Sequence, residues 1–540
     1  MTAPPHAADE PAADDPVVGD FDLGEVPTAR EIRRFTARAA RGRSGARAGA
    51  LLQDLYEAVV AVGIAALITG GTVRQLRDAL PPAPDVQAPG GLSLPVLVGV
   101  LLVAAVGALL SLAGRLGPVG LGGPEASWWL DLPVGRRGLL RPTARRLPLL
   151  AAGVGALVVL VLEAGMLERA GAPLARAALA GAVVAAGVVL AAGLAQTLGA
   201  PRRAAALTGD LLVLAAPVAA VLLVVTGVAP ADLPTPGAGV VLAGALLVAA
   251  CAVVVDRRLD DVPARTLREA GSVTSQALGA VVSLDSRELG RALGAGVAPR
   301  ARPWVSRLRT VRGPASALVT ADLVLLRRSS RHVVQIVVAL LLPVLATVVP
   351  QLASPAGVLL AVVVGGWVAA SGAGEGARWA QIAPVLDALL PLDARDVRRL
   401  RMVVPAAVML VWSLVVLGAV GRWAGAPLDW LVLAVASTPV WAAAAVRAAY
   451  RPSPDWSGPL IATPFGALPP GVMAVLVRGP DLVALCLLPL WVAVALQAAP
   501  PVLASVQLVL SVVAVVVGSS THERPWYERM LDDPDKAAPR

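Results

Sequence analysis

Two short polar stretches hold the residue types in this sequence that are best suited to binding chemistry. Residues 123–146 and 375–401 each carry a Leu-Pro pair followed by closely spaced arginines, and each lies between long apolar runs. A guanidinium group pairs well with carboxylates and phosphates. We predict that these first and second islands dock a partner protein at one face of a membrane. The residues assigned to docking are Pro133, Arg136, Arg137, Leu139, Leu140 and Arg141 in the first island, and Pro391, Arg395, Val397, Arg398 and Arg399 in the second.

The island arginines also have a simpler interpretation, which stays open. Arginines beside membrane spans fix the orientation of a protein and hold lipid phosphates without any partner protein. Under the docking hypothesis, each island forms a short helix whose entry is fixed by its proline. Leu139, Leu140 and Val397 would then be apolar knobs that a partner grips.

The rest of the sequence shows no catalytic or metal-binding constellation. The three histidines are scattered and both cysteines lie inside apolar runs, so a zinc site is not expected. A phosphate-binding P-loop needs Gly-x4-Gly-Lys-Ser/Thr, but the lysine Lys536 is followed by Ala537. We therefore predict no enzyme activity, cofactor or metal, and any ATPase must be a separate chain.

Ionisable residues near apolar runs are candidates for a transport pathway. Asp54 and Glu57 lie near the inner end of their run and Glu163 near the outer end of another, so no carboxylate is expected at the bilayer centre. Four tryptophans nearer mid-run could line an apolar path, although ordinary helix packing explains them more simply. They are Trp367, Trp412, Trp441 and Trp491.

Composition indicates that lipid is the solvent of this chain. Of its 540 residues, 57% are hydrophobic and 15% are charged, and the mean hydropathy is +0.73, whereas soluble proteins carry roughly 25% charged residues. The net charge of +9 comes largely from arginines beside apolar runs, which suits anionic lipids better than nucleic acid. We predict an all-α polytopic protein of the bacterial plasma membrane with about twelve spans.

The spans divide the chain into two membrane halves. The predicted order is a disordered acidic tail (1–29), a first membrane half (30–255), a cytoplasmic linker (256–331), a second membrane half (332–518) and a cytoplasmic tail (519–540). The expected spans are 52–71, 92–113, 147–166, 174–195, 207–228 and 237–255, then 332–351, 355–371, 402–420, 429–446, 480–498 and 501–518. Segment 457–481 is apolar but broken by prolines. Whether it crosses the membrane stays open, although orientation favours the inner face.

The charge of the joints sets the predicted orientation. Basic joints alternate with short or balanced ones, and the positive-inside rule then places both islands, the linker and both termini in the cytoplasm. The arginine-rich stretch 30–49 is predicted to lie as a helix on anionic lipids of the inner leaflet. An unstructured signal that only fixes orientation is the alternative.

The two halves form a weak internal repeat. A shift of 258 residues aligns the islands and two spans. It places Pro133 on Pro391, Arg137 on Arg395, Arg141 on Arg399, 147–166 on 405–424 and 237–255 on 495–513. Since each half has an even number of spans, both halves enter from the same side. They are therefore predicted to be parallel repeats related by an axis along the membrane normal.

The Leu-Pro-x-x-x-Arg loop between the second and third spans of each half resembles the loop of ABC-2 type transporter permeases. In that family the loop forms a coupling helix that docks in a groove of the ATPase, and a basic surface helix precedes the first span, as 30–49 does here. The resemblance implies the membrane part of an exporter driven by separate ATPase subunits. This chain departs from the family in fusing two six-span units, and Glu125 and Glu375 stand at different distances from their prolines.

Two further functions stay open. Twelve spans with a long central loop also fit a secondary transporter of the major-facilitator type, but the loop signature Gly-x3-Asp-Arg-x-Gly-Arg and a mid-membrane charge network are not seen in the sequence. A membrane scaffold that transports nothing is the third hypothesis. The substrate is not predicted.

Overall fold

The computed structural model describes most of the two membrane halves. The described residues are 27–44, 56, 60, 63, 70, 71, 93–227, 234–282, 286–295, 311–349, 352–451, 461–463, 466–468 and 478–521. The predictions made for Asp54, Glu57, the two terminal tails and segment 457–481 fall wholly or mostly outside these residues.

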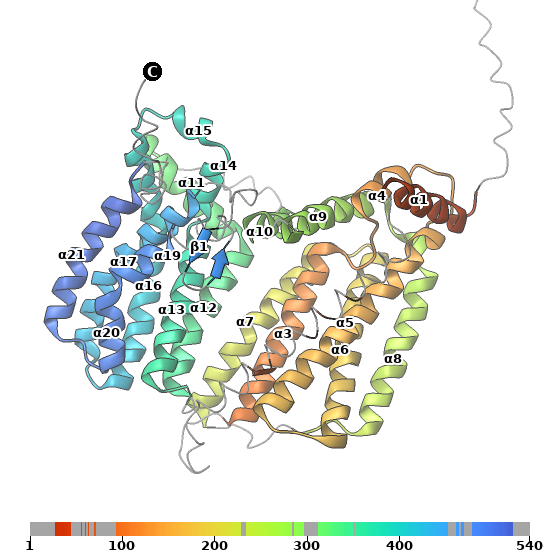
Figure 1. The fold of residues 1–540 in the computed structure, drawn as a ribbon, viewed down its shortest axis with the longest axis horizontal. Coiled ribbons are helices and arrows are strands. Elements are labelled where there is room, and N and C mark those ends of the chain that lie inside the picture. The colour runs from red at the N-terminus through yellow and green to blue at the C-terminus, as the bar shows by residue number, and fades with distance from the viewer. Residues whose placement is uncertain are drawn as a thin grey trace, which may run out of the picture.

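Ten helices in the described part of the chain are long and apolar enough to cross a membrane, and they form two bundles side by side (Figure 1). The first bundle contains α3 (Leu94–Leu116), α5 (Arg136–Met166), α6 (Gly171–Thr197), α7 (Arg202–Thr226) and α8 (Ala238–Arg257). The second contains α12 (Ser330–Val348), α13 (Pro355–Ala373), α16 (Ala394–Ala424), α17 (Pro427–Ala449) and α21 (Pro501–Gly518). The prediction of an all-α polytopic membrane protein is confirmed.

The two remaining predicted spans differ from these ten. Within 52–71 only residues 56, 60, 63, 70 and 71 are described, and all five are helical. The span 480–498 is divided into α19 (Pro480–Cys486) and α20 (Leu488–Leu496), because Pro489 has no N–H to continue the ladder across Leu487. In the described residues, a single antiparallel pair, β1 (Ile461–Thr463) and β2 (Gly466–Leu468), interrupts the helical architecture.

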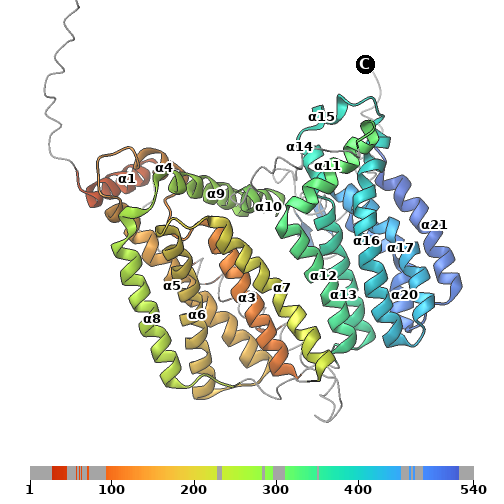
Figure 2. The same ribbon diagram turned by 180° about the vertical axis from the view of Figure 1, so that it is seen from behind.

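Shorter helices gather at one end of the two bundles, seen from both sides in Figures 1 and 2. They are α1 (Ala29–Ser44), α4 (Gly123–Trp128), η1 (Leu259–Asp261), α9 (Ala264–Val282), α10 (Ser286–Ala295), α11 (Pro314–Arg328), α14 (Glu375–Ile382) and α15 (Pro384–Ala388). Both islands and the described part of the linker therefore share this end, which we call the island face. Each island lies over its own bundle.

Helix boundaries support the predicted repeat. The offset of 258 residues carries the bounds of α5 onto those of α16, and each helix has 31 residues. The sequence Gly-Ala-Pro-Leu follows at 171–174 and again at 425–428. Gly171 and Gly425 both take the left-handed backbone conformation, with φ of 65° and 88°, which glycine adopts without steric cost. Packing repeats as well, since α5 contacts α6 and α6 contacts α8, as α16 contacts α17 and α17 contacts α21.

The halves meet where α7 packs on α12. Val96, Ala220, Leu345 and Val349 form a buried apolar cluster at this junction. On its other side, α7 crosses α3 at Gly209. The two helices are so close there that a Cβ added to Gly209 would lie 2.6 Å from the carbonyl oxygen of Gly107. Small residues permit such close approach of helices in lipid.

Candidate functional site

The second island carries an exposed apolar surface at the island face. On α15, Val385 and Leu386 are 70% and 66% exposed, and the adjacent Leu389 is 76% exposed. These side chains lie beyond the apolar spans, on a short helix that stands away from the bundle (Figure 1). An exposed apolar patch outside the spans is typical of a surface that binds a partner protein or a membrane.

A buried arginine ties this exposed helix to the membrane body. Arg401 of α16 is 8% exposed, and its guanidinium donates to Asp387 of α15 and Asp322 of α11, each at 2.6 Å. It also donates to the carbonyl oxygen of Gly376 in α14, at 3.3 Å. One side chain thus links four helices of the island face, which makes the α15 surface rigidly connected to a membrane span.

Asp322 responds to this environment. Burial raises the pKa of Asp322 to about 6, although the neighbouring Arg401 opposes the increase. Since the usual pKa of an aspartate is about 3.9, the folded protein binds the proton more tightly than the unfolded chain does. The contribution of this group to stability therefore falls as the pH rises from about 4 to above about 6.

This linkage gives a testable prediction for Asp322→Asn. The amide cannot titrate, so the thermal midpoint of the variant should depend less on pH between about 4 and about 6 than that of the unchanged protein. Thermal unfolding in detergent at a series of pH values measures the difference. Asp393→Asn, at an exposed position on the same face, is the control and should keep the original pH dependence. An unaltered pH dependence in Asp322→Asn would contradict the assignment.

The first island is bound into its own half. Arg137 and Arg141 of α5 pair with Asp256 of α8 at 2.6 and 2.8 Å. Arg136 donates to the carbonyl oxygen of Val262 at 3.0 Å, just after η1. Three of the arginines assigned to docking are therefore engaged within the chain, where they fasten the start of α5 to the end of α8.

The predicted apolar knobs need correction. Leu139, Leu140 and Val397 are 2%, 0% and 5% exposed, so they pack inside the protein and do not face a partner. They were assigned to the surface because they follow the Leu-Pro pair in a charged context. The charged residues around them belong to the first turns of α5 and α16. The apolar side of each of these helices packs against the rest of the protein.

The other predicted docking residues lie nearer the surface. Pro133, Pro391 and Arg395 are exposed, and the exposed Arg399 pairs with Asp396 at 3.5 Å. Arg398 is half-buried and lies with its guanidinium carbon 4.7 Å from the ring centre of Tyr450, while donating to the carbonyl oxygen of Ser520. The exposed apolar residues of the first island, missed by the sequence analysis, are Trp128 and Leu132, at 77% and 40%.

A basic groove lies beside the first island, between α1, α4 and α5. It has a volume of about 710 Å³. Its lining includes Arg30, Arg33, Arg34, Glu125, Trp128, Trp129, Pro142 and Arg146. Arg33 donates to the carbonyl oxygen of Gly138 at 2.7 Å, which fixes α1 against α5. Four guanidinium groups therefore face one carboxylate, so the groove is suited to an anionic ligand.

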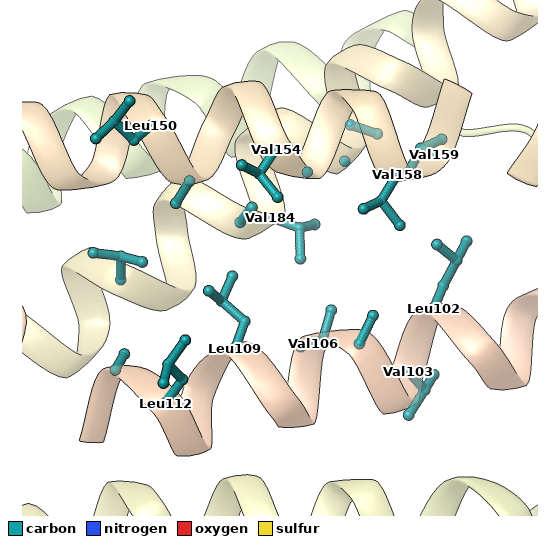
Figure 3. A pocket seen from close by; sticks show the side chains of 18 of the residues that line it. Leu102, Val103, Val106, Leu109, Leu112, Leu150, Val154, Val158, Val159 and Val184 are labelled. Atoms are coloured by element: carbon teal, nitrogen blue, oxygen red, sulfur yellow. The ribbon is translucent and has the colours of Figure 1, made fainter. Parts of the chain in front are cut away.

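An apolar pocket of about 670 Å³ lies within the spans of the first half, between α3, α5 and α6 (Figure 3). Its lining runs from Leu147 near the island face to Glu163 and Pro236 near the opposite end. Glu163, predicted as a pathway residue, is the titratable group among the lining residues. It is 4% exposed and pairs with Arg169 at 3.2 Å.

Comparison with protein families finds one match. Residues 88–459 match the profile of a family of unknown function, DUF6297. The match covers more than half of the chain, including both islands and the spans between them. Comparison with curated proteins and with solved structures finds no match.

Proposed function

The chain belongs to the DUF6297 family, and we propose that it is the membrane subunit of an ABC-type exporter, driven by a separate ATPase chain. The observation that carries this proposal is the exposed apolar surface of α15, held at the island face by Arg401. The first island lies at the same end of the molecule, over the other half of the repeat (Figure 2). One ATPase subunit could thus engage each half.

The proposal fixes an orientation in the bacterial plasma membrane. The island face carries the arginine-rich ends of the spans, which the positive-inside rule places in the cytoplasm, together with both termini. ATP is found on that side. Helix α1, with exposed arginines such as Arg30 and Arg34, then lies where the anionic headgroups of the inner leaflet are.

The contacts of Arg401 suggest how force would reach the membrane. A partner that shifts α15 would displace Asp387, which holds the guanidinium of Arg401 at 2.6 Å. Because Arg401 belongs to α16, a span of 31 residues, the displacement would pass directly to a membrane helix. Its second partner, Asp322, would move α11 with it. In this proposal the ion pairs of Arg401 couple the docking helix α15 to the membrane body.

Replacement of exposed apolar side chains of α15 by charged ones tests this function. We expect Leu386→Asp with Leu389→Asp to abolish association with an ATPase, because a buried carboxylate without a partner opposes docking. The tagged chain is purified from the cells that produce it, bound chains are tested for a P-loop sequence, and ATP hydrolysis by the complex is measured. Leu278→Asp on α9, an equally apolar and 60% exposed position on the same face, is the matched control.

The outcomes separate the proposal from its alternatives. Loss of the ATPase in the α15 variant, with retention in the control, supports docking at the island. If no P-loop protein accompanies the unchanged chain, or if the α15 variant retains it, the exporter proposal is wrong.

A further inference from the structure

We propose that the first half binds an anionic phospholipid, with its headgroup in the basic groove and an acyl chain in the apolar pocket. The binding site itself does not depend on the exporter function. Interpreting the lipid as the transported cargo rests on that proposed function. Two separate cavities and one internal comparison between the halves carry the inference.

The basic groove supplies the headgroup site. None of Arg30, Arg34 and Arg146 forms an ion pair with a carboxylate among the residues that the structure describes. Trp128 and Trp129 lie in the same lining, and tryptophan is enriched at the level of lipid headgroups. Arginine binds phosphate through several directed hydrogen bonds. The groove therefore fits a phosphate group held at the membrane surface.

The apolar pocket supplies the chain site. Its volume of about 670 Å³ lies within the range of roughly 300 to 1,000 Å³ found for small-molecule sites. Leu150 and Val154 of its lining are 65% and 60% exposed, so the pocket opens sideways into the bilayer. A water-filled state is disfavoured because almost no polar group could bind the water. Hydrocarbon is the occupant that this lining fits.

Comparison of equivalent positions in the two halves shows that the pocket-lining residues of the first half differ from their counterparts in the second. The offset of 258 residues places Leu109 on Trp367 and Val154 on Trp412. Both Leu109 and Val154 line the pocket (Figure 3). In the second half Trp412 is 1% exposed and donates from its indole nitrogen to the carbonyl oxygen of Ala339 at 3.2 Å. The indole ring of Trp412 thus fills a core position, and that of Trp367 is partly buried against the same core, where the first half has the smaller side chains of Val154 and Leu109.

The two cavities follow one another along the length of α5. Pro142 and Arg146 line the basic groove, and Leu150 and Val154 line the apolar pocket. These residues are spaced by four along the helix, so neighbours in the series share one side. From the island face inward, the lining is first polar and then apolar. A lipid of the inner leaflet has the same order, with its headgroup before its acyl chains. The arginines of the basic groove complement a negative charge, so the lipid that we propose is anionic.

The test uses the purified full-length chain without ATPase or nucleotide, so it is independent of the docking experiment. Native mass spectrometry measures retention of phosphatidylglycerol and of phosphatidylcholine with the same acyl chains. We expect phosphatidylglycerol to bind more tightly. Arg34→Glu with Arg146→Glu should weaken it by at least about fivefold, as expected when a favourable basic contact is lost, and should leave phosphatidylcholine unchanged. Arg265→Glu, at an 89% exposed side chain on α9, is the matched control.

A second pair of variants tests the chain site by importing the residues of the second half. Val154→Trp and, separately, Leu109→Trp should reduce retention of both lipids by at least about fivefold, because the ring fills the pocket. Both are made so that a folding defect in one does not decide the result, and thermal midpoints identify such a defect. Leu247→Trp, at a 72% exposed position on α8, is the control and should bind as the unchanged chain does.

Four results would overturn the proposal. Equal retention of the two lipids, or retention that the groove and pocket variants do not alter, removes the anionic lipid site. Displacement of the lipid by glycerol phosphate alone indicates a soluble anion in the basic groove. An efficient disulfide between Leu109→Cys and Ala61→Cys, in a chain whose two native cysteines are replaced by alanine, indicates that segment 52–71 fills the pocket instead.

Discussion

Replacement of Arg401 by methionine is expected to lower the free energy of unfolding by about 3–5 kcal/mol, the usual cost of removing one partner from a buried ion pair. Methionine preserves much of the side-chain volume but leaves Asp322 and Asp387 without the guanidinium that satisfies both. The loss should appear as a lower midpoint of denaturation in detergent. Under the exporter function proposed above, the same variant should still bind the ATPase through the exposed α15 side chains, but ATP hydrolysis should no longer drive transport.

Two further variants make this prediction specific. Arg399→Met changes an exposed arginine two positions away and should cost little, because its pair with Asp396 is more than half exposed on both sides. Adding Asp322→Asn and Asp387→Asn to Arg401→Met should restore part of the lost stability, because no uncompensated carboxylate remains. A triple variant as unstable as Arg401→Met alone would show that the ion pairs are not the cause.

Much of the architecture followed from the sequence, because lipid imposes a simple rule on it. Apolar runs of sufficient length form helices, and ten of the predicted spans are helices of that kind in the described part of the chain. The offset of 258 residues, found from Pro133 and Pro391, also relates the start of α16 to that of α5 in the structure. Local spacing and hydropathy are enough for such features.

The islands were harder to interpret, because the role of an arginine depends on which side chains the fold brings to it. Asp256 is separated from Arg137 by 119 residues, and Asp322 from Arg401 by 79 residues. No spacing rule in one sequence identifies such pairs. The exposed surface of α15 did carry a signal, the apolar residues Val385, Leu386 and Leu389 within a polar island. These residues precede the Leu-Pro pair, outside the arginine-rich pattern on which the docking prediction rests.

The pocket shows what the repeat can add to the sequence. Trp412 was identified as a mid-span residue that either lines a path or packs, and its burial supports packing. Its counterpart Val154 carries no functional signal in the sequence, since valine is common in membrane spans. Only the combination of the offset with the three-dimensional lining makes the absence of an indole ring at Val154 informative.

Replacement of Gly209 by leucine is the second change expected to have a large effect, and it tests the close crossing of α3 and α7 within the first half. A Cβ at this position would overlap the backbone nitrogen of Ser111 and lie 2.6 Å from the carbonyl oxygen of Gly107. These are backbone atoms that cannot rotate away, so α3 and α7 must separate. We expect a loss of about 3 kcal/mol, at the upper end for an overpacked core, together with disruption of the adjacent buried pair between Arg115 and Asp210, which are 2.7 Å apart.

The comparison with Gly153→Leu isolates the cause. Gly153 also lies within a span, but an added Cβ there would meet nothing within 4 Å, so leucine should be tolerated. Thermal midpoints and the rate of proteolysis in detergent should therefore differ strongly between the two variants. Similar midpoints would contradict the close crossing of α3 and α7. Because α7 also contacts α12, a displaced α7 should loosen the contact between the halves, and the two islands could then no longer act on one connected body.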